Sequence, residues 1–245
     1  MNFFKKIFGF IWAVWGLILF ALTSLIVWVP LAFTNSQPEP KRTYTFIHIA
    51  RWWMGLYLPL IGCPLRIKGR ENFKAGENYV VVCNHNSLMD VPVSYPGIPG
   101  GNKTIAKAEM AKTPVFGIIY QRGSVLVDRK SDASRKDSFS KMKSVLDLGL
   151  HMCIYPEGTR NKTKEPLAPF HDGAFKLSID SGKSIIPALM FYTKTVLPAD
   201  KGFYLWPHRL HFHFLPPVSP KGETVQSLRQ KVFDQMKEYY TTHQP

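Results

Sequence analysis

The side chains with the clearest chemical potential are His85 and Asp90, which follow a short apolar run at residues 79–83. That run is rich in valine and predicts a buried strand. The polar residues 84–87 favour turns and helix caps, and Pro92 is compatible with the first turn of a helix but not with its interior. The stretch therefore predicts a strand, a polar loop that carries His85, and a helix whose first turn carries Asp90.

The five-residue spacing requires the chain to turn between these two side chains. In a regular helix, five positions would rotate Asp90 by roughly 140° away from His85. A loop over a helix N-terminus lets the two meet, and the helix dipole favours a carboxylate there. If Asp90 accepts the Nδ1 proton of His85, it fixes the tautomer and leaves Nε2 free as a general base. The spacing alone is also compatible with a capping turn in which the histidine is incidental.

Two further polar clusters follow apolar runs. Asp128 and Arg129 come after the run at residues 124–127, and an acidic and basic cluster at residues 157–160 follows the run at 152–155. Because binding sites in open α/β sheets form at the carboxyl ends of the strands, we expect these loops to converge on one edge. Together they would offer a His/Asp pair, two guanidinium groups and a carboxylate.

The rest of the chain predicts the elements that position these loops. Amphipathic patterns predict helices at residues 137–150 and 225–240, and a further short helix is expected at 173–181. Short strand-like runs lie between them. Strands that alternate with helices predict an α/β fold. The remaining expected strands are residues 65–69, 185–191 and 210–215.

The N-terminal segment predicts membrane attachment. After Lys5 and Lys6 there is no charged residue before Glu39, and residues 7–33 are almost entirely apolar. About 20 apolar residues span a bilayer core, whereas the apolar part of a signal peptide usually has about 7–15 residues before a small-residue cleavage site. The sequence contains no such site. The positive-inside tendency places the two lysines in the cytoplasm.

A second apolar stretch, residues 44–63, follows a turn at residues 34–40 that contains two prolines. Arg51 and two tryptophans near its middle fit an interfacial or shallowly inserted helix better than a simple span. Both segments could dip into one leaflet, or the first could cross while the second lies on the surface. We expect a membrane-anchoring unit at residues 1–63 and a globular domain at residues 64–245.

The charge of the chain indicates anionic partners. It has 31 Lys and Arg against 17 Asp and Glu, a net charge of +14. The basic residues are dispersed and no recognition motif is visible, which argues against nucleic acid. The three cysteines form no CxxC pattern and predict neither a disulfide framework nor a zinc site. Cys83 and Cys153 lie in apolar runs and are expected to be small buried hydrophobes.

A metal site is not expected. His85, Asp90, His151 and Glu157 could be ligands in principle, but no helical HxxxH pairing occurs. A serine-hydrolase site is not expected either, because the sequence has no GxSxG elbow. Three late histidines alternate with apolar residues, which is typical of a strand with one solvated face. They are His208, His211 and His213.

Four sequence blocks occur in a fixed order: NHNSLMD at residues 84–90, GSVLVDR at 123–129, YPEGTR at 155–160, and IPAL at 186–189. With them the chain resembles the glycerolipid acyltransferase family, specifically the 1-acyl-glycerol-3-phosphate acyltransferases. The resemblance covers roughly residues 63–215 and includes an FxxGA-like run that begins at Phe170. A lone HxxxxD is weak evidence, whereas HxxxxD followed by VDR and EGTR is specific.

The resemblance implies a mixed, mostly parallel sheet flanked by helices, behind an N-terminal membrane-associated two-helix segment. It implies an enzyme that transfers a fatty acyl group to the free hydroxyl of 1-acyl-glycerol-3-phosphate, giving phosphatidic acid at the cytoplasmic face of the membrane. The acyl donor would be acyl-CoA or acyl carrier protein, used as a co-substrate. No cofactor or metal is implied.

The resemblance also implies roles for the polar residues. His85 is expected to be the general base, and Asp90 to hold the imidazole and stabilise its positive charge. Arg160 and Arg129 suit bidentate recognition of a phosphate, and Lys107 is expected to be a third cation. Either arginine could instead form a structural ion pair.

Three residues of the third block have open roles. Glu157 could orient Arg160, contact the substrate head group, or bind the backbone of its loop. Gly158 suits a close backbone approach or a positive φ, and Thr159 suits a phosphate contact or a turn cap. We also expect an apolar groove near the N-terminal helices to hold the acyl chain.

Other functions remain open at this stage. The acceptor could be lyso-ornithine lipid or glycerol-3-phosphate, or the donor could be a phospholipid. A membrane-anchored module that binds anionic lipid without chemistry would keep the basic surface. Such a module would have no need of His85 and Asp90, whose presence argues against it.

Overall fold

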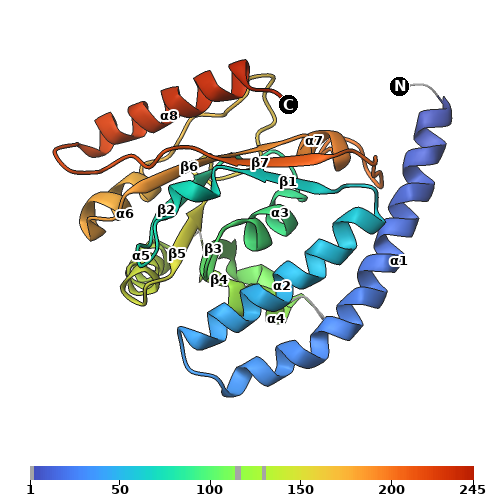
Figure 1. Cartoon of the computed structure of the whole chain (residues 1–245), viewed down its shortest axis with the longest axis horizontal. Helices are drawn as coiled ribbons and strands as arrows, with labels where there is room; N and C mark the ends of the chain where they lie inside the picture. Colours follow the sequence, from blue (N-terminus) through green and yellow to red (C-terminus); the bar gives the residue numbers. More distant parts are fainter. Residues whose placement is uncertain (1–2, 114–116, 129–130) are drawn as a thin grey trace.

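A seven-stranded sheet in the order β1-β7-β6-β2-β5-β3-β4 forms the centre of the computed structural model, which describes residues 3–113, 117–128 and 131–245 (Figure 1). Five strands, from β6 to β4, run parallel, while β7 is antiparallel to β6 and β1 is parallel to β7. The predicted mixed, mostly parallel sheet is confirmed. The strands are β1 (Leu65–Lys68), β2 (Val80–Cys83), β3 (Asn102–Lys107), β4 (Ser124–Val127), β5 (His151–Ile154), β6 (Ile185–Phe191) and β7 (Leu210–Phe214).

Helices cover both faces of this sheet. The helices α1 and α2 lie on one side and α8 lies on the other (Figure 1). The central strands β2 and β6 are buried on both faces, as expected for parallel strands between two helical layers. The helices are α1 (Phe3–Phe33), α2 (Lys41–Leu60), α3 (Asp90–Gly97), α4 (Gly117–Gly123), α5 (Asp132–Asp147), α6 (Gly173–Ser181), α7 (Thr193–Val196) and α8 (Val225–Thr242).

Alternate residues of β2 serve two separate cores. Val81 and Cys83 face α2 and α3, while Val80 and Val82 face α5, α6 and α8. Cys83 and Cys153 are free and buried in neighbouring strands, which confirms the prediction that they are small buried hydrophobes. The site described below therefore stands on a strand that is fixed from both sides.

The helix predicted at residues 137–150 begins earlier than expected. Helix α5 starts at Asp132, because Ser131 is its N-cap and accepts a hydrogen bond from the Ser134 N–H at 3.2 Å. It ends at Asp147, just before Gly149, which has a φ of +77° and reverses the chain. The apolar periodicity marked only the part of the helix that packs in the core.

The second apolar stretch forms helix α2, which packs between α1 and the sheet. Trp53 is buried there and its indole N–H donates to Thr23 Oγ1 at 2.8 Å. The guanidinium of Arg51 donates to the carbonyls of Pro96 and Ile98, each at 3.0 Å. Protein contacts therefore account for Arg51 and Trp53, whereas Trp52 is 59% exposed and the predicted contact of this helix with a membrane surface stays a prediction. The boundary predicted at residue 63 separates elements that share one hydrophobic core.

The expectation of a solvated histidine face on the late strand is wrong for His213. In β7 this residue is only 2% exposed, and its ring lies 5.1 Å from that of Phe191. Burial lowers the pKa of His213 to about 4. Its Nδ1 lies 3.3 Å from the Tyr239 hydroxyl, which comes from α8. The alternation of histidines with apolar residues was correctly predicted, but α8 covers the face of β7 at His213.

Candidate active site

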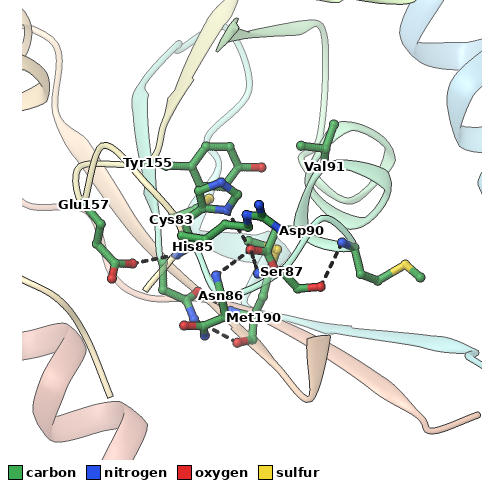
Figure 2. Close-up of polar contacts among 12 residues, drawn as sticks. Cys83, His85, Asn86, Ser87, Asp90, Val91, Tyr155, Glu157 and Met190 are labelled. Carbon is green, nitrogen blue, oxygen red and sulfur yellow. Dashed lines mark hydrogen bonds and ion pairs between the residues drawn. The ribbon is translucent and has the colours of Figure 1, made fainter. Parts of the chain in front are cut away.

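The loop that carries His85 is fixed at its start by Asn84. The Asn84 amide donates to the carbonyl of Met190 at 3.0 Å, and its side-chain oxygen accepts the Met190 N–H at 2.7 Å (Figure 2). The carboxamide thus continues the pairing between β2 and β6 by one residue beyond the strand end. From the sequence, Asn84 is predicted only to favour a turn, because its partner lies 106 positions away.

His85 and Asp90 meet, which is the first of the two arrangements that their spacing allowed. His85 Nδ1 lies 2.8 Å from Asp90 Oδ2, and Asp90 is the first residue of α3. The same oxygen accepts the backbone N–H groups of Asn86 at 2.6 Å and Ser87 at 2.7 Å (Figure 2). Because an ionised carboxylate only accepts, Nδ1 carries the proton and Nε2 keeps a free lone pair. The geometry is that of an oriented general base.

The ring of Tyr155 lies against the imidazole of His85, with centroids 4.4 Å apart and planes 25° apart (Figure 2). Its hydroxyl lies 2.7 Å from Ser94 Oγ, which anchors the ring to α3. His85 is therefore held by a hydrogen bond at one ring edge and by packing on one ring face. Tyr155 belongs to the third sequence block, but its role is not visible in the sequence, since only the fold brings it beside His85.

The loop after β5 binds both backbone groups of His85. Glu157 Oε1 accepts the His85 N–H at 2.6 Å, and the Asn161 N–H donates to the His85 carbonyl at 2.6 Å. Glu157 Oε2 accepts the Ala168 N–H at 2.8 Å. Glu157 is only 3% exposed and both of its oxygens are occupied, so it binds the loop backbone, the third of its possible roles. Glu157 thus positions the backbone of His85, and its predicted contact with substrate stays a prediction.

Stability should depend on pH through Glu157. Burial raises its pKa from 4.5 to about 7, despite the backbone hydrogen bonds from Ala168 and His85, which lower it. A raised pKa in the folded state favours the protonated form, so the stabilisation is complete below about pH 4.5 and is lost as the pH rises to about 7. Relative to Glu157→Gln, the wild type should lose roughly 3 kcal/mol of unfolding free energy over that range. Chemical denaturation in detergent at several pH values measures this difference, and a flat difference would contradict it.

Gly158 occupies a backbone conformation that suits glycine. Its φ is +69°, and a Cβ there would lie 2.9 Å from Cδ2 of His171. Both expectations for Gly158 are thus met. Thr159 is exposed, with its hydroxyl 3.3 Å from the Arg160 carbonyl. Arg160 is partly exposed and has no ion-pair partner among the described residues, which leaves its guanidinium available to a ligand.

Lys107 and the second block lie farther along the sheet. Lys107 is the exposed last residue of β3, the strand next to β5. Asp128 follows the edge strand β4, and its N–H donates to Ser134 Oγ at 3.0 Å. Arg129 lies outside the described residues. The strand order therefore places His85 in the loop after β2 and Glu157 and Arg160 in the loop after its neighbour β5, with Lys107 one strand beyond.

A protein-family model matches the part of the chain that contains this site. The model described as Acyltransferase matches residues 64–191, which is 128 of the 245 residues and contains every residue of the site described above. The match begins at β1 and ends with β6. The two N-terminal helices, β7 and α8 lie outside it.

Individual relatives agree with the family model. The chain is 30% identical over 167 residues to the mouse 1-acyl-sn-glycerol-3-phosphate acyltransferase alpha, covering 67% of this chain and 58% of the relative. It is 27% identical over 185 residues to the 1-acyl-sn-glycerol-3-phosphate acyltransferase of Haemophilus influenzae, covering 74% of each. The chain thus spans about three fifths of the length of the mammalian relatives it matches.

A solved structure shows the same fold over nearly the whole chain. The crystal structure of the 1-acyl-sn-glycerophosphate (LPA) acyltransferase PlsC from Thermotoga maritima matches with a TM-score of 0.83 at 19% identity, covering 98% of this chain and 99% of that one. The likeness therefore includes α1 and α2, which the family model omits. Because the family model matches more than half of the sequence and includes the site, the chain belongs to the acyltransferase family.

Proposed function

We propose that this chain transfers a fatty acyl group from a thioester donor to the free hydroxyl of 1-acyl-glycerol-3-phosphate, giving phosphatidic acid. The observation that carries the proposal is the His85–Asp90 contact of 2.8 Å, in a loop whose backbone is held by Glu157 and Asn161. Proteins named for this activity among the relatives support the choice of acceptor. The donor would be acyl-CoA or acyl carrier protein.

The reaction needs one base and no covalent acyl-enzyme. His85 Nε2 takes the proton of the acceptor hydroxyl while the oxygen attacks the thioester carbonyl. The C–S bond of the resulting tetrahedral intermediate then breaks, and the leaving thiolate takes the proton back from the imidazolium. Asp90 stabilises that imidazolium through the charge-assisted hydrogen bond to Nδ1.

The phosphate of the acceptor would be bound by Arg160, with Lys107 as a second cation. A guanidinium presents a planar fork that matches a phosphate in a bidentate manner. Arg160 follows directly on the positive-φ residue Gly158 and the exposed Thr159, so the block leads the chain from the buried Glu157 to the surface. We also propose that Arg129 binds this phosphate, and this part of the proposal rests only on the sequence.

Helix α1 supports insertion into one leaflet at the cytoplasmic face. Among the described residues it is the one helix long and apolar enough to cross a membrane, with a mean hydropathy of 2.4. Its exposed face is apolar, while small residues such as Gly9 and Ala13 lie on the buried face. The Leu205 N–H donates to the Gly9 carbonyl at 3.0 Å, and Arg122 donates to the Leu31 carbonyl.

Because the protein holds α1 near both ends, the helix lies along the domain rather than projecting alone through the bilayer. One-leaflet insertion keeps the N-terminus and residue 245 on the same side of the membrane. Protease protection of tags placed at the two ends tests this. Tags on opposite sides would show a full crossing instead.

Arg160→Ala tests the proposed acceptor. Acyl transfer from labelled acyl-CoA to lysophosphatidic acid in detergent micelles should yield phosphatidic acid with the wild type. Arg160→Ala should raise the acceptor KM by about 10- to 100-fold, because charge-assisted hydrogen bonds to phosphate are lost. The donor KM should stay the same. Arg66→Ala is the matched control and should behave as wild type, because Arg66 is an exposed arginine on the edge strand β1.

The same assay separates the alternatives. Turnover with lyso-ornithine lipid or glycerol-3-phosphate but not with lysophosphatidic acid would change the acceptor and keep the reaction class. An unchanged acceptor KM in Arg160→Ala would remove that residue from phosphate binding. Binding of the wild type to anionic vesicles without turnover of any acceptor, using either acyl-CoA or acyl carrier protein, would favour a non-catalytic lipid-binding module.

A further inference from the structure

A cavity of about 400 Å³ opens directly beside the His85 loop. Its wall includes Asn86, the residue after His85, together with Tyr192 and Lys194 after β6, Lys164 from the loop after Arg160, and Tyr240 of α8. The volume falls in the range of small-molecule sites in proteins, about 300–1,000 Å³. Neither Arg160 nor Lys107 contributes to the wall.

The cavity lies between the end of β6 and the loop after β5, because its wall takes residues of the segment 191–195 from the first and residues 163–166 from the second. In the strand order β6-β2-β5-β3, the cavity is at the end of β6, His85 follows β2, and Lys107 ends β3. Three strand spacings separate β6 from β3, which is about 14 Å. Lys107, the proposed second cation for the acceptor phosphate, is therefore remote from the cavity, while Arg160 belongs to the loop that also lines it.

The lining suits a phosphate at the end of a polar chain. The wall carries Lys164 and Lys194 against the single carboxylate of Glu165, and the hydroxyl of Tyr192 donates to Pro245 at its rim. The ammonium of Lys194 lies 3.5 Å from the Thr163 carbonyl, at the limit of a hydrogen bond, so its donors remain largely free for an anion. The carboxamide of Asn86 has no hydrogen-bond partner in the described part of the chain, and it borders both the cavity and His85.

Backbone strain marks the same wall. Tyr192 has a φ of +67° and is the one residue other than glycine with a positive φ among the described residues. A positive φ is unfavourable for a bulky side chain and persists only where the surrounding structure requires it. Here it ends β6 and starts α7, which brings Lys194 to the cavity.

We propose that this cavity binds the phosphate of the phosphopantetheine arm of the acyl donor, with Lys164 and Lys194 as its cations and Asn86 as a contact to the arm. The inference rests on the proposed acyl transfer and specifies how the donor enters. Coenzyme A and acyl carrier protein share this arm, so one cavity serves either source. The thioester at the far end of the arm then reaches His85, which is adjacent to Asn86 in the chain.

The test uses two donors that differ only in the phosphate, acyl-4′-phosphopantetheine and acyl-pantetheine. For the wild type, kcat/KM should be about 10-fold or more higher with the phosphorylated donor. In Lys164→Gln/Lys194→Gln this ratio should fall close to one, while the KM for the acceptor stays unchanged. Lys183→Gln, two residues before the opposite end of β6, is the matched control and should keep the wild-type ratio. An unchanged ratio in the double variant would overturn the inference.

Acyl-CoA and acyl carrier protein, used as intact donors, show which of the two the cavity serves. A fall in kcat/KM with acyl-CoA, with acyl carrier protein or with both names the donor that the cavity serves, and no fall with either overturns the inference. Calorimetry measures the binding of 4′-phosphopantetheine without any turnover. It therefore tests the cavity even if the proposed acyl transfer itself is not observed. Equal binding to the wild type and the double variant, or no binding to either, also counts against the cavity. Thermal unfolding of each variant checks that it is folded.

Discussion

Replacing His85 by alanine should lower kcat for acyl transfer by roughly 10²–10⁴-fold, the usual contribution of a positioned general base. The loss should fall on kcat more than on either KM, because the imidazole acts on the proton that moves in the transition state. The side chain is held by Asp90 at Nδ1 and by the ring of Tyr155, so its Nε2 is the group left for chemistry. Initial rates with lysophosphatidic acid and acyl-CoA measure the effect.

Two controls make this result specific. His48→Ala removes an exposed histidine of α2 and should leave turnover unchanged. Thermal unfolding of His85→Ala shows whether the loop survives, since the backbone of His85 keeps its hydrogen bonds to Glu157 and Asn161. A folded His85→Ala variant with wild-type turnover would remove His85 from the mechanism and with it the proposed base.

Local signals explain what the sequence predicted correctly. The valine-rich strand, the turn-forming residues after it and the position of Asp90 at the start of a helix all depend on neighbours in the chain. They allowed His85 and Asp90 to meet but fitted a capping turn equally, and the resemblance of the four blocks favoured the pair, which the structure gives at 2.8 Å. The positive φ of Gly158 was predicted for the same reason, since glycine is favoured there by its own backbone.

Contacts distant in the sequence explain what was missed. Glu157 binds the His85 backbone across 72 positions, and Asn84 binds Met190 across 106. No periodicity or propensity encodes such partners. Arg51 was predicted to lie at a membrane surface because its real partners were not visible in the sequence. The carbonyls that accept from its guanidinium lie 45 and 47 positions away. The residue types at these positions were visible in the sequence, and only the fold showed which groups they bind.

Asp90 allows the charge and the hydrogen bonds of the site to be tested separately. All three donors, His85 Nδ1 and the N–H groups of Asn86 and Ser87, bind the single atom Oδ2. The other oxygen, Oδ1, has no partner among the described residues. In Asp90→Asn the amide oxygen can take the place of Oδ2 and keep all three hydrogen bonds, so the tautomer of His85 is preserved. The negative charge is lost, and the amide NH₂ takes the buried Oδ1 position, which has no partner among the described residues.

Asp90→Asn should therefore lower kcat by about 10²-fold or more, less than Asp90→Ala, which removes both the charge and the three hydrogen bonds. The estimate starts from the attraction between unit charges 4 Å apart, which is about 4 kcal/mol at an effective dielectric of about 20. Solvent replaces part of this attraction in the variant, so the expected loss is smaller. In serine hydrolases the corresponding asparagine costs about 10⁴-fold, because the wrong tautomer forms. Rates of the two variants, measured with the same donor and acceptor, give the comparison.

The double variant His85→Ala/Asp90→Ala shows whether the two residues act as one unit. If Asp90 works only through His85, adding Asp90→Ala to His85→Ala should lower kcat little further, as happens when catalytic groups are interdependent. If the two losses multiply instead, Asp90 has a separate role in shaping the loop, through the N–H groups of Asn86 and Ser87. Equal rates for Asp90→Asn and Asp90→Ala would show that the charge carries the whole effect, and that the three hydrogen bonds to Oδ2 only set the position of the carboxylate.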